Sequence, residues 1–140
     1  GIPALFPDWS PDGRSIVFQR PRERESNFYE LWTVGRDGSR LSRIYGAKEW
    51  GAINPTWSPD GGSIVFAAVS KSPESKWTER QADDLWLVRA DGTGLSRLTA
   101  DPAPEWNPVW SVTQRIFFAS GRENTTNIWS IRAPSRLPGQ

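Results

Sequence analysis

One sequence motif occurs three times along this chain and constrains the fold more than any other feature. Each copy has a proline, a tryptophan two residues later and a short apolar run, and its tryptophans are Trp9, Trp57 and Trp110. The steps between these tryptophans are 48 and 53 residues. Repeats of this length with several β-like runs are typical of β-propeller blades. The sequence therefore predicts three units, at residues 6–45, 54–99 and 107–137, the last one incomplete.

Each unit reads as short strands joined by polar turns. Ser-Pro-Asp-Gly at 10–13 and 58–61 predicts a hairpin turn, because proline fixes φ and Asp and Gly accept tight conformations. An apolar strand follows, and then a strand around Trp32, Trp86 or Trp129 with apolar residues on both faces. Asp-Gly turns lead to fourth strands at 41–44 and 95–98, whereas 135–137 is a weak candidate in the third unit. We therefore expect an all-β propeller of four-stranded blades.

The composition excludes several classes of chemistry. The 140 residues include no histidine and no cysteine, which excludes disulfides, imidazole bases and the commonest zinc ligands. The net charge of +1 does not predict binding to nucleic acid or to an anionic membrane. No apolar run is long enough to span a bilayer. Because no serine has a plausible base, we predict a non-enzymatic chain without a cofactor.

The repeats resemble the TolB-type propeller repeat, a WD-like family. Its blades carry Pro-x-Trp-Ser-Pro-Asp-Gly, an apolar strand, a Trp-containing strand, an Asp-Gly turn and a final Arg-Leu-Thr, here Arg97-Leu98-Thr99. The third unit departs from it, with Val112-Thr113-Gln114 in place of Pro-Asp-Gly. The resemblance implies a six-bladed ring in many members and a bacterial periplasmic or secreted setting. It does not imply one activity, because relatives serve as protein-binding modules, lids of serine peptidases or scaffolds of polysaccharide lyases.

Three blades cannot close a ring, since propellers typically have four to eight. Their two outer faces would remain apolar and uncovered. A two-fold homodimer would cover them and complete a six-bladed ring, and so would further blades of a longer chain. We favour the homodimer.

The candidate binding site lies in the connections between the second and third strands, whose lengths differ between units. These connections hold residues 20–27, 70–81 and 121–127, on rigid blades where binding loops are expected. Three tryptophans outside the expected strands fall at the same rim and could stack a sugar or anchor a peptide. The alternative is that they plug the channel or pack under the loops. The candidate residues are Trp50, Trp77, Trp106, Glu49, Glu105, Asn54, Asn107 and Arg122.

The carboxylates give weaker signals. Asp12, Asp37, Asp60 and Asp91 stand where turns use aspartate for local hydrogen bonds, so we expect structural roles. Residues 79, 83 and 84 could contribute to a hard-cation site, but their spacing matches no calcium loop, and no metal site is predicted.

Three functions remain open. The first is a non-catalytic module that presents its loop-rich rim to a protein or peptide. The second is a carbohydrate- or small-ligand-binding propeller that uses the rim tryptophans. The third is the lid portion of a larger serine peptidase, whose Gly-x-Ser-x-Gly motif is absent from this sequence.

Overall fold

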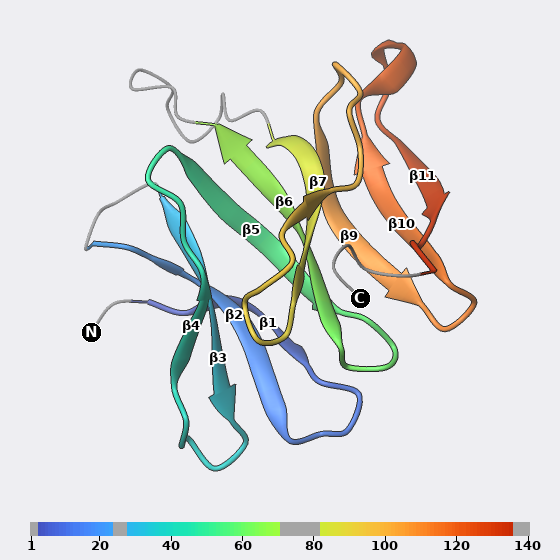
Figure 1. Cartoon of the computed structure of the whole chain (residues 1–140). Helices are drawn as coiled ribbons and strands as arrows, with labels where there is room; N and C mark the ends of the chain where they lie inside the picture. The colour runs from blue at the N-terminus through green and yellow to red at the C-terminus, as the bar shows by residue number, and fades with distance from the viewer. Residues whose placement is uncertain (1–2, 24–27, 71–81, 136–140) are drawn as a thin grey trace.

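The computed structural model describes residues 3–23, 28–70 and 82–135, and it contains three antiparallel sheets that stand side by side, one for each repeat (Figure 1). Blade 1 consists of β1 (Leu5–Trp9), β2 (Ser15–Pro21), β3 (Tyr29–Gly35) and β4 (Ser42–Tyr45). Blade 2 consists of β5 (Trp50–Trp57), β6 (Ser63–Ser70), β7 (Ala82–Arg89) and β8 (Ser96–Arg97). Blade 3 consists of β9 (Glu105–Ser111), β10 (Arg115–Ser120) and β11 (Asn127–Arg132). The predicted all-β class, with one sheet per repeat, is confirmed.

Strands follow each other across each sheet in chain order. Blade 3 has three strands among the described residues, and a single 3-10 turn, η2 (Arg122–Asn124), precedes β11. The weak fourth strand predicted at 135–137 falls mostly on residues 136 and 137, which lie outside the described residues. No helix in the described part of the chain is long and apolar enough to cross a membrane.

Each sheet has two faces, and we name them by the neighbour that they meet. The leading face of a blade points toward the next blade in the chain, and the trailing face points toward the previous one. At the first joint, between blades 1 and 2, Val17 and Leu31 of the leading face pack against Ile64 and Phe66 of the trailing face. The second joint, between blades 2 and 3, is built in the same way by the residues Val65, Ala67, Leu85, Leu87, Ile116, Phe118 and Ala133.

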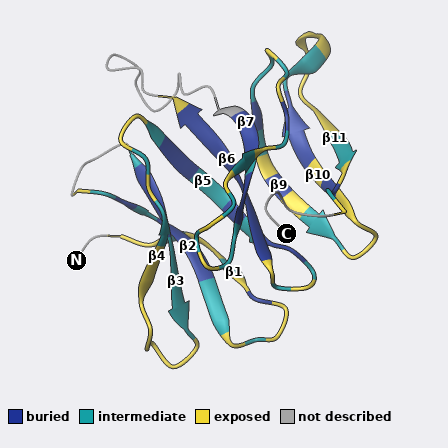
Figure 2. Ribbon diagram, in the orientation of Figure 1, coloured by how far each residue is buried: buried dark blue, intermediate teal, exposed yellow. Residues whose placement is uncertain are grey.

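Blade 2 is covered on both faces, and its strands are the most buried (Figure 2). Seven consecutive residues of β6, Ser63 to Val69, are buried. The alternating faces expected for the second strands are therefore present, and both are filled.

The hairpin turns form the edge of each sheet that we call the turn edge. In blade 1 the Ser10 hydroxyl donates to Asp12 Oδ1 at 2.6 Å and accepts from the main-chain N–H of Ser15 at 2.9 Å. Blade 2 repeats these bonds, and Gly13 and Gly61 have φ of 67° and 71°. The divergent turn of blade 3 keeps the shape, because Gln114 adopts φ of 58° at the glycine position. The structural role expected for Asp12 and Asp60 is thus visible in their bonds.

The opposite edge, from which the longer connections leave, is the loop edge. The first strands extend further toward it than the sequence suggested. Trp50 is the first residue of β5 and Trp106 is the second of β9, so the expectation that both lie outside strands was wrong. The reason is that pairing with β6 and β10 continues past the asparagine-proline step, across a bulge.

Candidate functional site

Each first strand has a β-bulge at the residue before its proline. The pairing register shifts at this point in all three blades, and Phe6, Asn54 and Asn107 there have φ of 51°. Asparagine tolerates this left-handed conformation better than most residues, whereas phenylalanine is strained in it. Asn54 and Asn107, two of the predicted site residues, therefore occupy matching backbone positions within the first strands of neighbouring blades.

The bulge of blade 2 is held by blade 1. The main-chain N–H of Asn54 donates to Oε1 of the buried Gln19 at 2.7 Å. Gln19 directly follows the phenylalanine of its second strand, and the residue that directly follows Phe66 in blade 2 is Ala67, which has no acceptor. Within the described residues no side chain accepts a hydrogen bond from the Asn107 N–H, and Asn107 is exposed. The two bulges thus differ in what lies opposite their amides.

A second contact strengthens the first joint. Asp8 Oδ2 accepts hydrogen bonds from the main-chain N–H of Trp57 at 2.8 Å and from the Thr56 hydroxyl at 2.9 Å. The corresponding residue in blade 2 is Thr56, and no matching bond to Trp110 is found among the described residues. Asp8 and Gln19 were not predicted as functional residues, because the repeat pattern carries no information about which side chains cross a joint.

The second joint uses a buried carboxylate instead. Glu105 is fully buried, with 0% of its surface exposed, and it accepts short hydrogen bonds from the Thr99 hydroxyl and from Nη2 of Arg122. Thr99 in turn accepts from the main-chain N–H of Leu85 at 2.9 Å. Nε of Arg122 also lies 3.2 Å from a carboxylate oxygen of Asp101. The structure therefore brings the predicted residues Glu105 and Arg122 together, in a network that ties blade 3 to the end of blade 2.

Arg122 is further fixed by two aromatic rings. Its guanidinium carbon lies 5.1 Å from the ring centroid of Trp129 and 5.6 Å from that of Phe118. These are cation–π distances. Carboxylates neutralise the charge of Arg122, and two aromatic rings contact its guanidinium group. Arg122 therefore holds the loop edge of blade 3 in one arrangement.

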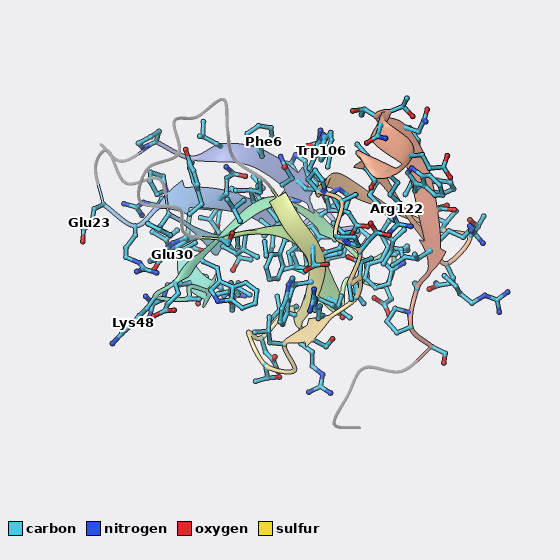
Figure 3. The ribbon with its side chains drawn as sticks, turned by 90° about the horizontal axis from the view of Figure 1, so that it is seen from above. Phe6, Glu23, Glu30, Lys48, Trp106 and Arg122 are labelled. Atoms are coloured by element: carbon cyan, nitrogen blue, oxygen red, sulfur yellow. The ribbon has the colours of Figure 1, made fainter. Side chains whose placement is uncertain are left out.

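Blade 1 has a related cluster at its loop edge. The buried carboxylate of Glu30 pairs with Arg22 and with Arg43, each at 3.2 Å, and Arg22 also donates to the main-chain oxygen of Ala47. Figure 3 shows Glu30 and Arg122 toward opposite ends of the molecule. Arg22 and Arg122 each follow the phenylalanine of their second strand by four residues, and this spacing was a usable signal that sequence analysis missed.

The rim tryptophans do not form one set. Trp50 lies edge-on against Trp86, with ring centroids 4.8 Å apart and an interplanar angle of 82°, and it is half-buried. Trp106 packs against the core of the second joint. Trp50 pairs with Ser70 and Trp106 with Ala119, so the two Glu-Trp steps occupy different positions in their blades. Glu49 is exposed next to Trp50, and Trp77 lies outside the described residues.

The structure describes one of the three side chains that we considered for a cation site. The carboxylate of Asp84 is buried and pairs with Arg97 at 2.6 Å, while the side chains of residues 79 and 83 lie outside the described residues. Among the side chains that the structure describes, no group of three or more acidic residues could hold a metal ion. Asp84 therefore has a structural partner in its own blade.

The turn aspartates are titrating groups with structural hydrogen bonds. The Ser10 hydroxyl and the Arg14 N–H lower the pKa of Asp12, and the Ser58 hydroxyl and the Gly62 N–H lower that of Asp60. Asp37 and Asp91 have lowered pKa values from the same kind of contact, with Ser39 and Thr93. All four lie at the turn edge, away from the predicted binding rim.

Comparisons with known proteins agree with this architecture, although no family model matches the chain. The Tol-Pal system protein TolB of Anaeromyxobacter dehalogenans is 37% identical over 106 residues, which are 76% of this chain. A putative TolB structure from Agrobacterium tumefaciens matches 94% of the chain with a TM-score of 0.74 at 23% identity, and 46% of that structure is covered. The chain is built of TolB-type β-propeller repeats. It spans about a fifth, 21%, of the length of the curated relatives that it matches.

The TolB-type fold also occurs beside other activities. A prolyl endopeptidase structure matches 95% of this chain with a TM-score of 0.60 at 13% identity, and 20% of that structure is covered. This likeness concerns the fold alone. The function of these TolB-type repeats must therefore be argued from their own loop edge.

Proposed function

We propose that these TolB-type repeats form part of a non-catalytic binding propeller that presents its loop edge to a protein or peptide partner. Two features support this. The curated relatives are named as components of a Tol-Pal system, and the loop edge combines rigid strands with connections that differ from blade to blade. In keeping with the relatives, we place the protein in the periplasm or outside a bacterial cell.

The observation that carries the proposal is the difference between the two bulge amides. The main-chain amide of Asn54 is satisfied by the side-chain amide oxygen of Gln19, whereas Ala67 stands at the equivalent place and no described side chain accepts from the Asn107 amide. A peptide carbonyl is chemically the same group as the Gln19 amide oxygen. A bound peptide could therefore supply at Asn107 the acceptor that blade 1 supplies at Asn54.

The test uses that internal comparison. Peptides selected from a displayed library would be measured against the chain and against Ala67→Gln, which brings an amide oxygen to the position of Gln19. We expect peptide binding to weaken about tenfold or more, the cost of about one hydrogen bond to a polar partner. Asp60→Asn at the turn edge is the matched control and should bind as the original chain does. Selected peptides that lose affinity only with turn-edge variants would overturn the proposal.

The Ala67→Gln side chain enters a buried position, so folding must be checked separately. Thermal unfolding of the variant serves this purpose. Asn107→Gly keeps both the left-handed backbone and the main-chain N–H, so it is a second control that should bind as the original chain does. Loss of peptide affinity in an Ala67→Gln variant that keeps its melting temperature counts for the proposal. Unchanged affinity in that folded variant counts against it.

One observation favours carbohydrate binding as a second candidate. Trp50 and Trp86 form a half-buried aromatic pair at the loop edge, and such surfaces stack against sugar rings. Trp50→Ala should then abolish glycan binding with little change in melting temperature. Trp106→Ala is the contrasting variant, since Trp106 packs against a core and its loss should lower stability.

We also propose that the repeats work within a closed ring. Trp57 is 8% exposed because it packs in the first joint, whereas its counterpart Trp9 is 55% exposed, since no described residue covers the trailing face of blade 1. Either a second copy or further blades could cover that face. Sedimentation at equilibrium would separate these cases, since the single chain has a mass of 15.8 kDa.

A further inference from the structure

A groove runs along the turn edge of the second joint, between the hairpin turns of blades 2 and 3. Its volume is about 930 Å³, which is within the range of binding pockets. Blade 2 contributes Ser58 and Ser63 from its first turn, and blade 3 contributes Trp110 and Thr113 from the matching turn. The groove therefore lies between two docked blades, at the edge opposite to the loop edge.

At the first joint, two glycines of blade 2 bring its turns close against blade 1. A Cβ atom on Gly61 would lie 3.4 Å from Cγ of Pro11, and one on Gly92 would lie 2.7 Å from the main-chain oxygen of Ile44. The second distance is shorter than real Cβ contacts, so the approach of this turn to blade 1 requires glycine. The turns of the first joint are thus in contact because two of their residues lack side chains.

Blade 3 has side chains at both of these positions. Gln114 takes the place of Gly61, because each donates its main-chain N–H to the serine carbonyl three residues earlier and has a positive φ. Ser135 takes the place of Gly92, because each follows by three residues the arginine that ends its third strand. Gln114 and Ser135 both line the groove. The divergent turns of blade 3 therefore account for the space at the second joint.

The walls of this groove carry an excess of positive charge. Arg89 lines it from blade 2, and Arg115 and Arg132 line it from blade 3, where they are directly opposite each other in the pairing of β10 with β11. The carboxylate among the described lining residues is that of Asp60. Three arginines against one aspartate leave a net charge of +2, contributed from both walls.

The contacts within the chain leave this charge in place. Asp60 Oδ1 accepts from the Ser58 hydroxyl at 2.5 Å, inside its own turn. Arg115 donates to the Ser130 hydroxyl at 2.6 Å, which is a neutral group. Among the described residues neither Arg115 nor Arg132 forms an ion pair, and both are exposed. The groove is therefore a positively charged site that lacks a matching set of carboxylates.

We propose that this groove binds an acidic peptide segment, whose carboxylates pair with the arginines of both walls. The planar guanidinium group matches a carboxylate with two parallel hydrogen bonds, so arginine suits this ligand. Because the arginines come from two blades, a ligand with several linked carboxylates gains more than a single free anion. Thr113 and Gln114 add neutral polar groups to the same surface. The site is separate from the loop edge, and the inference does not depend on the function proposed there.

Hexaglutamate labelled with fluorescein is the probe, and hexaglutamine of the same length is the neutral probe. Fluorescence anisotropy on the full chain should show that hexaglutamate binds about tenfold or more tightly than hexaglutamine. Arg132→Gln removes an exposed charge and should weaken hexaglutamate binding about threefold or more. Arg89→Gln/Arg132→Gln removes one charge from each wall and should weaken it about tenfold or more.

The matched control is Arg14→Gln/Arg36→Gln. It removes the same number of charges from the turn edge of blade 1, at two exposed residues that do not line the groove. This variant should bind hexaglutamate as the original chain does. An equal loss of affinity in the control and in Arg89→Gln/Arg132→Gln would show general charge attraction and would rule out the groove as the site.

Two further measurements locate the ligand and define its class. Amide chemical shifts should change with hexaglutamate at Ser63 and Gln114 and stay constant at Asn54; changes confined to residues outside the groove would disprove the site. Inorganic phosphate at the concentration of the peptide should leave the peptide bound, and complete displacement would reassign the groove to a free anion. Near-ultraviolet circular dichroism checks that each variant is folded. If Arg89→Gln disturbs folding, Arg132→Gln and the shift changes decide the question.

Discussion

The carboxylate of Asp8 binds the main-chain N–H of Trp57 in the next blade, at 2.8 Å. The same oxygen accepts from the Thr56 hydroxyl, so one side chain of blade 1 fixes the first strand of blade 2 beside its buried tryptophan. The bond orients two sheets that otherwise meet through apolar side chains, which pack without directional preference. The first joint is therefore specified by polar geometry as well as by hydrophobic contact.

Asp8→Ala should lower the free energy of unfolding by about 1–3 kcal/mol, because it leaves the Trp57 amide and the Thr56 hydroxyl without their acceptor. Urea unfolding followed by tryptophan fluorescence measures the change. Asp8→Asn keeps an acceptor oxygen and should lose less. Equal losses in the two variants would show that the charge, rather than the acceptor, matters.

Phe6→Asn should raise the free energy of unfolding by about 1 kcal/mol. Phe6 has φ of 51° and is 56% exposed, so the substitution relieves backbone strain and gives up little packing. The melting temperature reports the gain. The mirror substitution Asn54→Phe should destabilise the chain, and a stabilising Asn54→Phe would contradict the strain argument.

Arg122→Ala should be among the more damaging single changes, at about 3 kcal/mol, because it leaves the buried carboxylate of Glu105 without its cation. Blade 2 has Ala52 at the position of Glu105, two residues before the asparagine of the same bulge motif. The double variant Glu105→Ala/Arg122→Ala should therefore recover part of the loss. Chemical denaturation of the singles and the double gives the coupling energy. Additive losses would mean that the pair is not a unit.

The pH dependence of stability should include the turn aspartates. The Ser58 hydroxyl lowers the pKa of Asp60 in the folded chain below its ordinary value of 3.8. Its contribution is therefore present above about pH 4 and is lost as the pH falls through the lower folded value. Ser58→Ala should flatten this part of the stability curve. An acid unfolding curve that keeps its shape in Ser58→Ala would refute the assignment.

The repeat pattern predicted the elements well because turns and strand faces are encoded locally. The proline of each turn, the left-handed position after Asp12 and the alternation around Leu31 all appeared as expected. These features depend on residues close together in the chain, so a single sequence contains them.

The side chains that form hydrogen bonds across the joints could not be predicted in this way. Gln19 meets Asn54 across 35 residues of sequence, and Asp8 meets Trp57 across 49. Which side chain reaches across depends on the distance and angle between sheets, and the motif says nothing about either. The same limit applies to Trp50, since its position in β5 follows from pairing with Ser70.

The burial of β6 on both faces has a consequence for how the chain holds together. Among the described residues, the two apolar clusters join blade 1 to blade 2 and blade 2 to blade 3, so blade 2 connects the two outer blades. A defect in β6 would uncouple the two ends, and they would then melt as separate units. In the described part of the chain, the middle sheet therefore couples the folding of blade 1 to that of blade 3.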